Sequence, residues 1–229
     1  MSADTALPPV IAIDGPSASG KGTIAAAVAR QLGFHYLDSG VLYRIVGLAG
    51  TERGANLDDD AQMSRIALNL NIKFDDGRVW LDHRDVSDLV RDEGAGAAAS
   101  RVGALPGVRI ALMALQRGFR RAPGLVADGR DMASVVFQDA QLKIYLTATA
   151  EERAQRRYKQ LIDKGHSANI TALLQDICAR DLRDSTRVAA PLQKCADAVE
   201  IDTTGTPADA VVAQVLRLYQ KHQKQQKTQ

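Results

Sequence analysis

The chain has 229 residues, of which 45% are hydrophobic and 24% charged, with a formal net charge of +2 and two cysteines. This length and balance fit either one globular core or one domain with an insertion, and so small a net charge gives no general attraction to nucleic acid or to an acidic membrane surface. Because the cysteines lack metal-binding spacing, no apolar run reaches the length of a membrane span and the first residues do not form a signal peptide, we expect a cytoplasmic protein without a disulfide framework.

The first predicted element is a buried strand over the apolar residues 10–13. A glycine-rich loop follows at 15–20, and then a helix with apolar residues at every fourth position, which share one face. The loop glycines let the backbone turn with its N–H groups pointing inward, where they and the positive end of the helix hold phosphate oxygens. Strand, loop and helix in this order predict a phosphate-binding loop rather than an ordinary glycine-rich turn.

Lys21 follows the loop and would add a mobile positive charge for β- and γ-phosphates. In the strict form of the motif the next residue is a serine or threonine, but here it is Gly22, and the hydroxyl comes one residue later, at Thr23. This Gly-Lys-Gly-Thr variant resembles nucleoside monophosphate kinases more than GTPases or ATPase motors. Thr23 could then contact either Mg²⁺ or only a phosphate.

A second short strand is predicted at 34–37, and an amphipathic helix follows it. Ser39 is placed to cap this helix, and Arg44 lies about one turn inside it. Taken alone, these are an ordinary cap and a solvated helix residue. A helix N-terminus after a parallel strand is, however, also a place where a second anion binds.

The pattern changes in residues 70–106. Alternating apolar and polar residues on either side of the Asp-Asp-Gly turn at 75–77 predict an antiparallel hairpin, and 86–90 add a third short strand or a turn. A stretch of small residues, 94–102, precedes a helix that Pro106 opens. We expect an antiparallel insert in a chain that otherwise alternates strands and helices.

The helix after this insert carries an apolar stripe that should face a core, formed by Val108, Leu112, Leu115 and Phe119. Arg109 falls off that stripe. Its spacing alone therefore predicts a surface charge.

The second informative stretch is 124–131, Gly-Leu-Val-Ala-Asp-Gly-Arg-Asp. Its apolar residues run into Asp128, as at a Walker-B strand end, where a carboxylate can orient Mg²⁺ or its waters. Arg130 and Asp131 follow at the carboxyl end of the strand, where open α/β sheets bind ligands. A local surface ion pair is the alternative interpretation.

Beyond a fourth parallel strand at 142–146, Thr149 and Glu152 form a capping box for an arginine-rich helix that ends near 165. A second helix begins near 170, and a last strand and helix follow at 198–202 and after Pro207. The second helix places four charged residues on one face by their i, i+3, i+4, i+7 spacing: Arg180, Arg183, Asp184 and Arg187. This face is either solvated or a phosphate site, because clustered guanidiniums favour an anion.

Four motifs in this order resemble the bacterial cytidylate kinase family. They are Gly-Pro-Ser-Ala-Ser-Gly-Lys-Gly-Thr (15–23), Leu-Asp-Ser-Gly with Tyr43-Arg44, Asp-Gly-Arg-Asp-Met (128–132), and Arg-Asp-Leu-Arg-Asp-Ser-Thr-Arg (180–187) with Ala-Pro-Leu (190–192). The resemblance extends from about residue 10 to the last helix. It implies an α/β, three-layer, P-loop nucleoside monophosphate kinase fold with a five-stranded parallel sheet, a small antiparallel β/α domain that binds the monophosphate, and a short helical lid.

The resemblance also implies the reaction: Mg²⁺-dependent transfer of the ATP γ-phosphoryl group to CMP or dCMP, giving ADP and CDP or dCDP, in pyrimidine nucleotide metabolism. ATP would contact Gly15, Pro16, Ser17, Ala18, Ser19, Gly20, Lys21, Gly22, Thr23 and Arg156. CMP would contact Ser39, Arg44, Ser100, Arg109, Arg130, Asp131, Arg180, Asp184 and Arg187. Catalysis would rest on Lys21, Arg130, Arg187 and Asp128, with Mg²⁺ held by ATP near Thr23 and Asp128 and no direct metal ligand assigned.

Within the CMP set, the family assigns Arg44, Arg130 and Arg187 to the phosphate, Arg180 with Asp184 to the ribose, and Ser100, Arg109 and Asp131 to the base. The kinase core would be 1–69 and 107–229, with a lid at about 153–187 and a CMP-binding insert at 70–106. A monomer with small-molecule substrates, and with no nucleic-acid or membrane partner, is expected.

Three rival functions remain at this point. One is a P-loop kinase for another acceptor, such as AMP, UMP, shikimate or dephospho-coenzyme A. Another is a nucleotide-dependent switch, which the lack of an Asn-Lys-x-Asp motif disfavours. The third is an idle binding module, which would not need the complete set of Lys21 and arginines.

Overall fold

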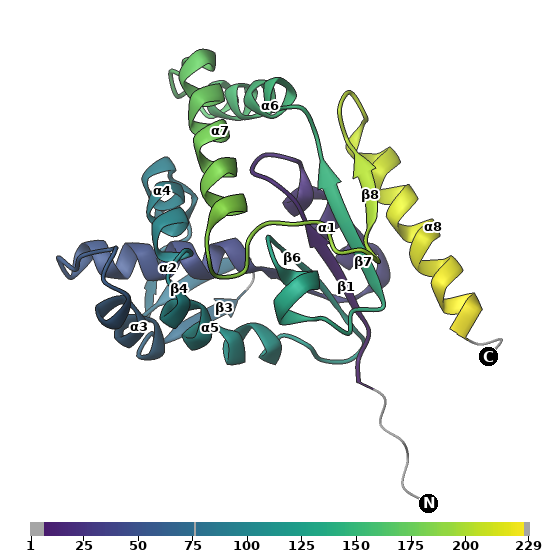
Figure 1. Ribbon diagram of the computed structural model, residues 1–229, viewed down its shortest axis with the longest axis horizontal. Helices are drawn as coiled ribbons and strands as arrows, with labels where there is room; N and C mark the ends of the chain where they lie inside the picture. The colour runs from purple at the N-terminus through teal and green to yellow at the C-terminus, as the bar shows by residue number, and fades with distance from the viewer. Residues whose placement is uncertain (1–6, 76, 227–229) are drawn as a thin grey trace, which may run out of the picture. The chain divides into compact units, whose positions relative to one another are not determined.

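A computed structural model describes residues 7–75 and 77–226 (Figure 1). The chain divides into two compact units, which are described separately. The first comprises Met1–Leu37, Gly118–Thr186 and Ala190–Gln229, and the second comprises Asp38–Arg117 and Arg187–Ala189.

The first unit is built on a five-stranded sheet in the order β2-β6-β1-β7-β8. The strands are β1 (Val10–Asp14), β2 (His35–Asp38), β6 (Leu125–Gly129), β7 (Leu142–Thr147) and β8 (Val199–Asp202). β1 pairs in parallel with β6 and β7, and β7 with β8. Both β1 and β6 are buried at every residue, which explains their continuous apolar sequences. The predicted five-stranded parallel sheet is confirmed.

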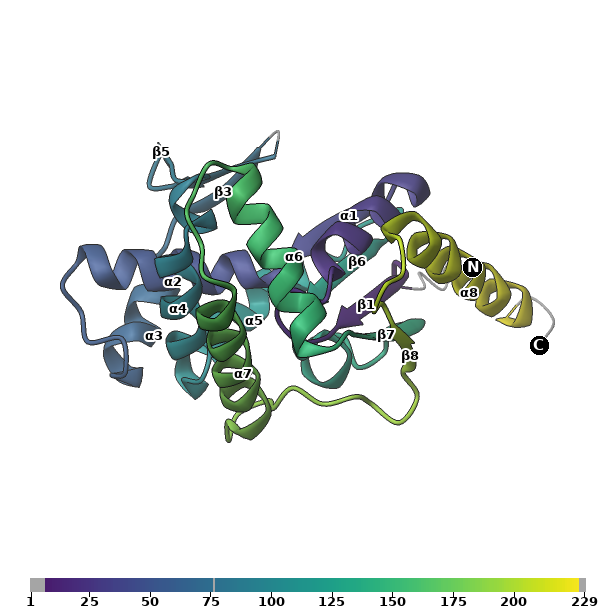
Figure 2. The ribbon, with the colours of Figure 1, turned by 90° about the horizontal axis from the view of Figure 1, so that it is seen from above.

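Helices α1 (Lys21–Leu32) and α8 (Ala208–Gln226) lie side by side on one face of the sheet (Figure 2). Ile24 and Val28 of α1 pack in the same buried cluster as Val211 and Val215 of α8, against β-strand residues such as Ile144. The regularly spaced apolar residues of α1 therefore form the face that packs on the sheet. This packing fixes the helix and, with it, the phosphate-binding loop at its N-terminus.

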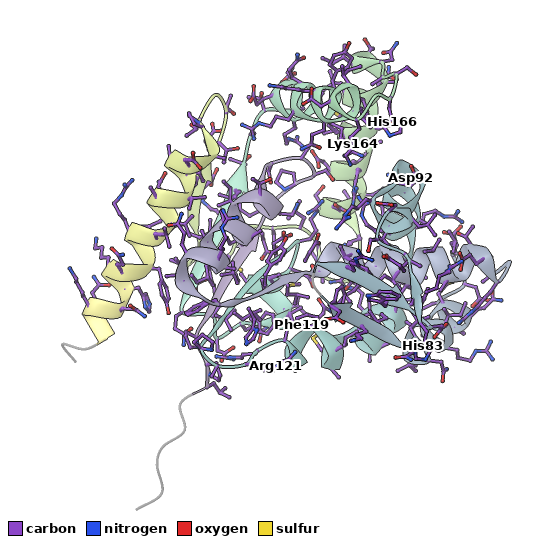
Figure 3. The ribbon with its side chains drawn as sticks, turned by 180° about the vertical axis from the view of Figure 1, so that it is seen from behind. His83, Asp92, Phe119, Arg121, Lys164 and His166 are labelled. Carbon is purple, nitrogen blue, oxygen red and sulfur yellow. The ribbon has the colours of Figure 1, made fainter. Side chains whose placement is uncertain are left out.

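A helical pair, α6 (Ala150–Asp163) and α7 (Ile170–Thr186), follows β7. Thr149 caps α6 by accepting a hydrogen bond from the Glu152 N–H, as predicted. The turn between the helices carries the exposed side chains of Lys164 and His166 (Figure 3). One turn of π-helix, η2 (Met132–Val136), lies directly after β6.

The second unit combines helices with a separate antiparallel sheet in the order β3-β4-β5. Its elements are α2 (Ser39–Glu52), α3 (Asp60–Leu68), β3 (Ile72–Asp75), β4 (Arg78–Leu81), β5 (Arg84–Asp85), the 3₁₀ turn η1 (Leu89–Arg91), α4 (Glu93–Val102) and α5 (Pro106–Gly118). The predicted hairpin is confirmed, and one residue of its turn, Asp76, lies outside the described residues. In the segment 86–90, residues 87–88 form a turn and 89–90 begin η1, so of the two predicted alternatives the turn is confirmed.

Close contact between α2 and α4 depends on Gly47. A Cβ on this glycine would lie 2.8 Å from the Cβ of Ala98, so no larger residue fits without moving one helix. The small residues of 94–102, which give no strong signal in the sequence, are therefore the contact surface of a helix. Ile45 and Ala49 of α2 also bury the hairpin residues Val79 and Leu81.

Three local predictions are wrong. Asp38, not Ser39, caps α2, because the Asp38 side chain accepts from the Val41 N–H and Ser39 is already helical. Leu115, expected in the core, is 38% exposed. Its place on the buried face of α5 is taken by Gln116 and by Arg109, which is only 6% exposed rather than a surface charge.

Within the described residues, no single helix is long and apolar enough to cross a membrane; only the pair Gly94–Val102 and Pro106–Gly118, bent by 102°, meets the criteria of length and composition.

Candidate functional site

The phosphate-binding loop has the backbone that an anion cradle requires. Ala18 and Gly20 have positive φ values of 58° and 88°, which turn successive N–H groups toward one side, and Gly20 caps α1. The Lys21 Nζ donates to the carbonyl of Pro16, 3.2 Å away, so the lysine is folded back over its own loop. The Ser17 and Ser19 side chains are both buried.

A cavity of about 690 Å³ opens beside this loop. Its lining is Ala18–Ile24, five residues of α6 (Glu152, Arg156, Lys159, Gln160 and Asp163) and, from the segment after β8, Thr203, Gly205–Ala208 and Val211. More than half of the lining thus comes from two segments far from the loop in sequence. The volume falls within the range of small-molecule sites and suits a nucleotide.

Two arginines of α6 donate hydrogen bonds to backbone carbonyls of the phosphate loop. Arg153, which is buried, donates to the Ser17 carbonyl at 3.1 Å and pairs with Asp181 of α7 at 2.6 Å. Arg156 donates to the Ser19 carbonyl and to Thr203. These contacts make α6, the first helix of the predicted lid segment, a direct support of the phosphate loop. The sequence showed the arginine-rich helix but not this role of Arg153.

Asp128 stands at the end of β6, and its carboxylate reaches the loop. A Cβ built on Gly22 would lie 3.3 Å from Asp128 Oδ2, and the Tyr36 hydroxyl donates to the same oxygen at 2.8 Å. Tyr36 lies on β2, and no motif in the sequence pointed to it. Thr23, by contrast, is exposed on the first turn of α1.

Arg130 joins three parts of the first unit. Its Nε donates to Asp184 Oδ2 of α7 at 2.9 Å, and its Nη2 donates to the Ser17 hydroxyl at 3.0 Å. Asp184 is buried and also lies 4.0 Å from the Arg180 Nε, whereas Arg183 is exposed. The structure therefore brings Arg130, Arg180 and Asp184 together at the phosphate loop.

The segment that carries Arg130 and Asp131 is anchored by a residue the sequence did not single out. Asp14, at the end of β1, accepts hydrogen bonds from the backbone N–H groups of Met132 and Ala133 at 2.9 and 2.8 Å. Burial raises the pKa of the Asp14 carboxyl to about 6, against the opposing effect of those two hydrogen bonds, and the nearby Asp131 raises it further.

This raised pKa predicts a pH dependence of stability. In the unfolded chain the carboxyl has its ordinary pKa of 3.8, so between the two values the folded state binds the extra proton and is favoured at the lower pH. Urea unfolding of the wild type, relative to the non-titrating Asp14→Asn, should show a free energy of unfolding higher by about 1 kcal/mol at pH 5 than at pH 7. A difference that stays constant or shrinks toward pH 5 would contradict the effect of burial on this carboxyl.

In the second unit, two of the predicted arginines meet at one carbonyl. Arg109 donates to the Gly103 oxygen at 2.9 Å, and Arg187 approaches the same oxygen at 3.5 Å. The Arg109 guanidinium also lies 5.5 Å from the centre of the Tyr43 ring. Two like charges gathered at a neutral acceptor form a region that favours an anionic or strongly accepting ligand.

The other predicted residues of this unit are placed individually. Ser39, on the first turn of α2, and Ser100, near the end of α4, are both buried. Arg44 donates from Nη1 to the carbonyls of Val90 and Asp92 at 2.9 and 3.1 Å, so it fixes η1 and the residue that follows it. A role of Arg44 toward a phosphate stays a prediction.

The first unit also fits a Mg²⁺ ion that arrives with a nucleotide. The described residues contain no group of three or more His, Cys, Asp or Glu side chains that could hold a metal on their own. Mg²⁺ usually needs only one or two carboxylates besides phosphate oxygens and water. The Asp128 carboxylate, in contact range of Gly22 in the phosphate loop, supplies that kind of group.

Comparison with known proteins agrees with this geometry. The family model described as cytidylate kinase matches residues 11–221. The cytidylate kinase of Nitrosomonas europaea is 55% identical over 216 residues, which cover 94% of this chain and 97% of that protein. The cytidylate kinase of Chromobacterium violaceum is 56% identical over 215 residues, again with 94% and 97% covered.

A solved structure, a gluconokinase from Sinorhizobium meliloti 1021, has a TM-score of 0.50 at 16% identity and covers 96% of this chain and 98% of that one. At this identity the likeness concerns the fold alone.

Proposed function

The chain belongs to the cytidylate kinase family, and from this premise we propose that it transfers the γ-phosphoryl group of ATP to CMP or dCMP, giving ADP and CDP or dCDP. The observation that carries the proposal is the phosphate loop with Lys21, in the same unit as the network of Arg130 and Asp184. The phosphate loop would bind ATP, and Arg130 would supply positive charge for the transferred phosphoryl group. We also propose a monomer that acts in the cytoplasm, without a nucleic-acid or membrane partner.

On the donor side, the backbone N–H groups of residues 15–23 would hold the ATP phosphates, and Lys21 would move from the Pro16 carbonyl to the β- and γ-phosphate oxygens. The cavity bounded by Arg156 and the segment after Thr203 would take the rest of the nucleotide. Mg²⁺, when bound between the phosphates, would neutralise part of their charge. Asp128, and on the exposed side Thr23, would orient its waters.

The acceptor needs no general base. The second pKa of a phosphate monoester is about 6, so the attacking phosphate is largely a dianion at neutral pH. What the transferred phosphoryl group needs is positive charge that is already in place, since negative charge is spread over its oxygens in the transition state. Arg130 and Arg187, with Arg44, would supply it, and the Asp184 contact holds Arg130 in one orientation.

The sugar and base of CMP would be read by the remaining residues. Arg180 and Asp184 would contact the ribose. Cytosine offers an N4 amine donor beside the N3 and O2 acceptors, so a carboxylate, Asp131, would accept from N4, while Ser100 and Arg109 would donate to the acceptors. The insert at 70–106 would be part of the CMP-binding domain. The segment 153–187 would act as a lid that excludes water from the transfer.

The test is the release of ADP from ATP and Mg²⁺ with CMP, dCMP, UMP, AMP, GMP and shikimate as separate acceptors. Fast turnover on CMP and dCMP alone is expected. Preference for another acceptor would keep the phosphoryl transfer but remove Ser100, Arg109 and Asp131 from base recognition. ATP binding without turnover on any acceptor would favour a nucleotide-dependent switch or an idle binding module.

A further inference from the structure

A tyrosine outside the family motifs donates a hydrogen bond to a carboxylate beside the phosphate loop. Tyr36, on β2, is half-buried, and its hydroxyl donates to Asp128 Oδ2 at 2.8 Å across 92 residues of sequence. Asp128 is 3% exposed, so the direction of its carboxylate depends on protein partners more than on water. In the proposed reaction Asp128 orients the waters of Mg²⁺, whereas no role has been assigned to Tyr36.

The absence of a side chain at Gly22 leaves space for the hydrogen-bonded pair of Tyr36 and Asp128. In the strict form of the loop, residue 22 would carry a hydroxyl, whereas here it has no side chain. A Cβ at this position would lie 3.3 Å from Asp128 Oδ2 and 3.6 Å from the Tyr36 Oη. The Asp128 carboxylate and the Tyr36 hydroxyl therefore occupy the space beside residue 22. A serine or threonine at position 22 would compete for this space, so the glycine there and the Tyr36–Asp128 hydrogen bond depend on each other.

We propose that Tyr36 is a positioning residue that fixes the Asp128 carboxylate at the phosphate loop for the Mg²⁺ that accompanies ATP. The inference rests on the proposed function, because it concerns the metal of that same donor site. A hydrogen bond to an ionised carboxylate favours the charged form and restricts its rotation. Groups that orient a metal-linked carboxylate in this way typically contribute about 10- to 100-fold to metal affinity or activity.

The experiment measures how much Mg²⁺ strengthens the binding of ATP, by calorimetry without CMP, so that no turnover enters. For each protein, the ratio of ATP affinities with and without Mg²⁺ is the readout. In Tyr36→Phe this ratio should fall about tenfold relative to the wild type, while the affinity for metal-free ATP stays the same. Tyr219→Phe, which removes a tyrosine hydroxyl from α8 in the same unit, is the matched control and should keep the wild-type ratio.

A double-mutant cycle separates positioning from simple packing. Asp128→Asn should lower the ratio on its own, and adding Tyr36→Phe should lower it no further, because the tyrosine acts through that carboxylate. Gly22→Ala is a second, independent variant: its Cβ would press on Asp128 Oδ2, and we expect it to lower the same ratio.

The inference is overturned if Tyr36→Phe keeps the wild-type ratio, or if its effect adds to that of Asp128→Asn. Should Tyr36→Phe fail to fold, an unchanged ratio in Gly22→Ala overturns the inference in its place. A wild type whose ATP binding does not respond to Mg²⁺ also overturns it. Failure of the proposed function is seen separately, as a wild type that binds ATP with Mg²⁺ but does not phosphorylate CMP.

Discussion

Lys21→Ala is expected to lower kcat about 100- to 1,000-fold and to leave the fold intact. This magnitude is the usual effect of removing one preorganised donor from a site where negative charge develops. The Lys21 Nζ donates to the Pro16 carbonyl within its own loop, and the residue begins α1 without entering the buried cluster of that helix. Its loss should therefore affect the transition state more than the folded state. Steady-state kinetics with saturating CMP, together with thermal unfolding, measures both.

The control for this variant is Lys221→Ala, which removes an exposed lysine from α8 in the same unit. It should retain wild-type kinetics. Near-normal turnover in Lys21→Ala would remove the phosphate loop from the mechanism. A large drop in the melting temperature would mean instead that the lysine supports the fold.

Asp131→Ala is expected to lose the preference for CMP over UMP rather than the binding of ATP. Asp131 is 2% exposed, so a base that meets it does so away from water. Uracil has a carbonyl where cytosine has the N4 amine, and a buried mispairing of two acceptors costs roughly 1–3 kcal/mol. The ratio of kcat/KM values for CMP and UMP should therefore fall about tenfold to a hundredfold.

Asp131→Asn is the sharper companion, because an asparagine amide can either accept from cytosine or donate to uracil. It should raise kcat/KM for UMP as well as lower it for CMP. Calorimetry with ATP checks that the donor site is unchanged. An unaltered CMP/UMP ratio in both variants would show that Asp131 does not read the base.

The sequence predicted best those parts of the fold that depend on local pattern. β1, the loop and α1 follow from an apolar run, two glycines and a helical stripe, and the Thr149 cap follows from its own motif. The α2 cap was missed by one residue, because aspartate and serine are both good caps and stand next to each other at 38 and 39.

Contacts between residues far apart in the sequence could not be predicted from local pattern. Arg109 is off the apolar stripe of α5 but is buried, because the Gly103 carbonyl and the Tyr43 ring accept its guanidinium. The Tyr36–Asp128 and Asp14–Met132 hydrogen bonds join residues 92 and 118 positions apart. A single sequence shows which side chains can make such bonds but not which strands bring them together.

The same holds for the site: residues in motifs were predicted, whereas residues that act through long-range contacts were not. The motifs led to the phosphate loop, Arg130, Asp184 and Asp128, which the structure places together in the first unit. They did not lead to Arg153, whose buried guanidinium supports the Ser17 carbonyl. The assignment of all nine residues to CMP stays a prediction, which kinetic variants can test: Ser39, Arg44, Ser100, Arg109, Arg130, Asp131, Arg180, Asp184 and Arg187.

Transfer to CMP is tested most directly by following the γ-phosphoryl group itself. ATP labelled at the γ-phosphate is mixed with the protein, Mg²⁺ and CMP, and the quenched reaction is separated by chromatography. For a kinase specific for CMP, we expect the label to appear in CDP, in equal amount to the ADP formed, and little of it in UDP when UMP replaces CMP. Label found only in inorganic phosphate would rule out transfer to CMP, and label transferred to UMP as readily as to CMP would rule out the base preference.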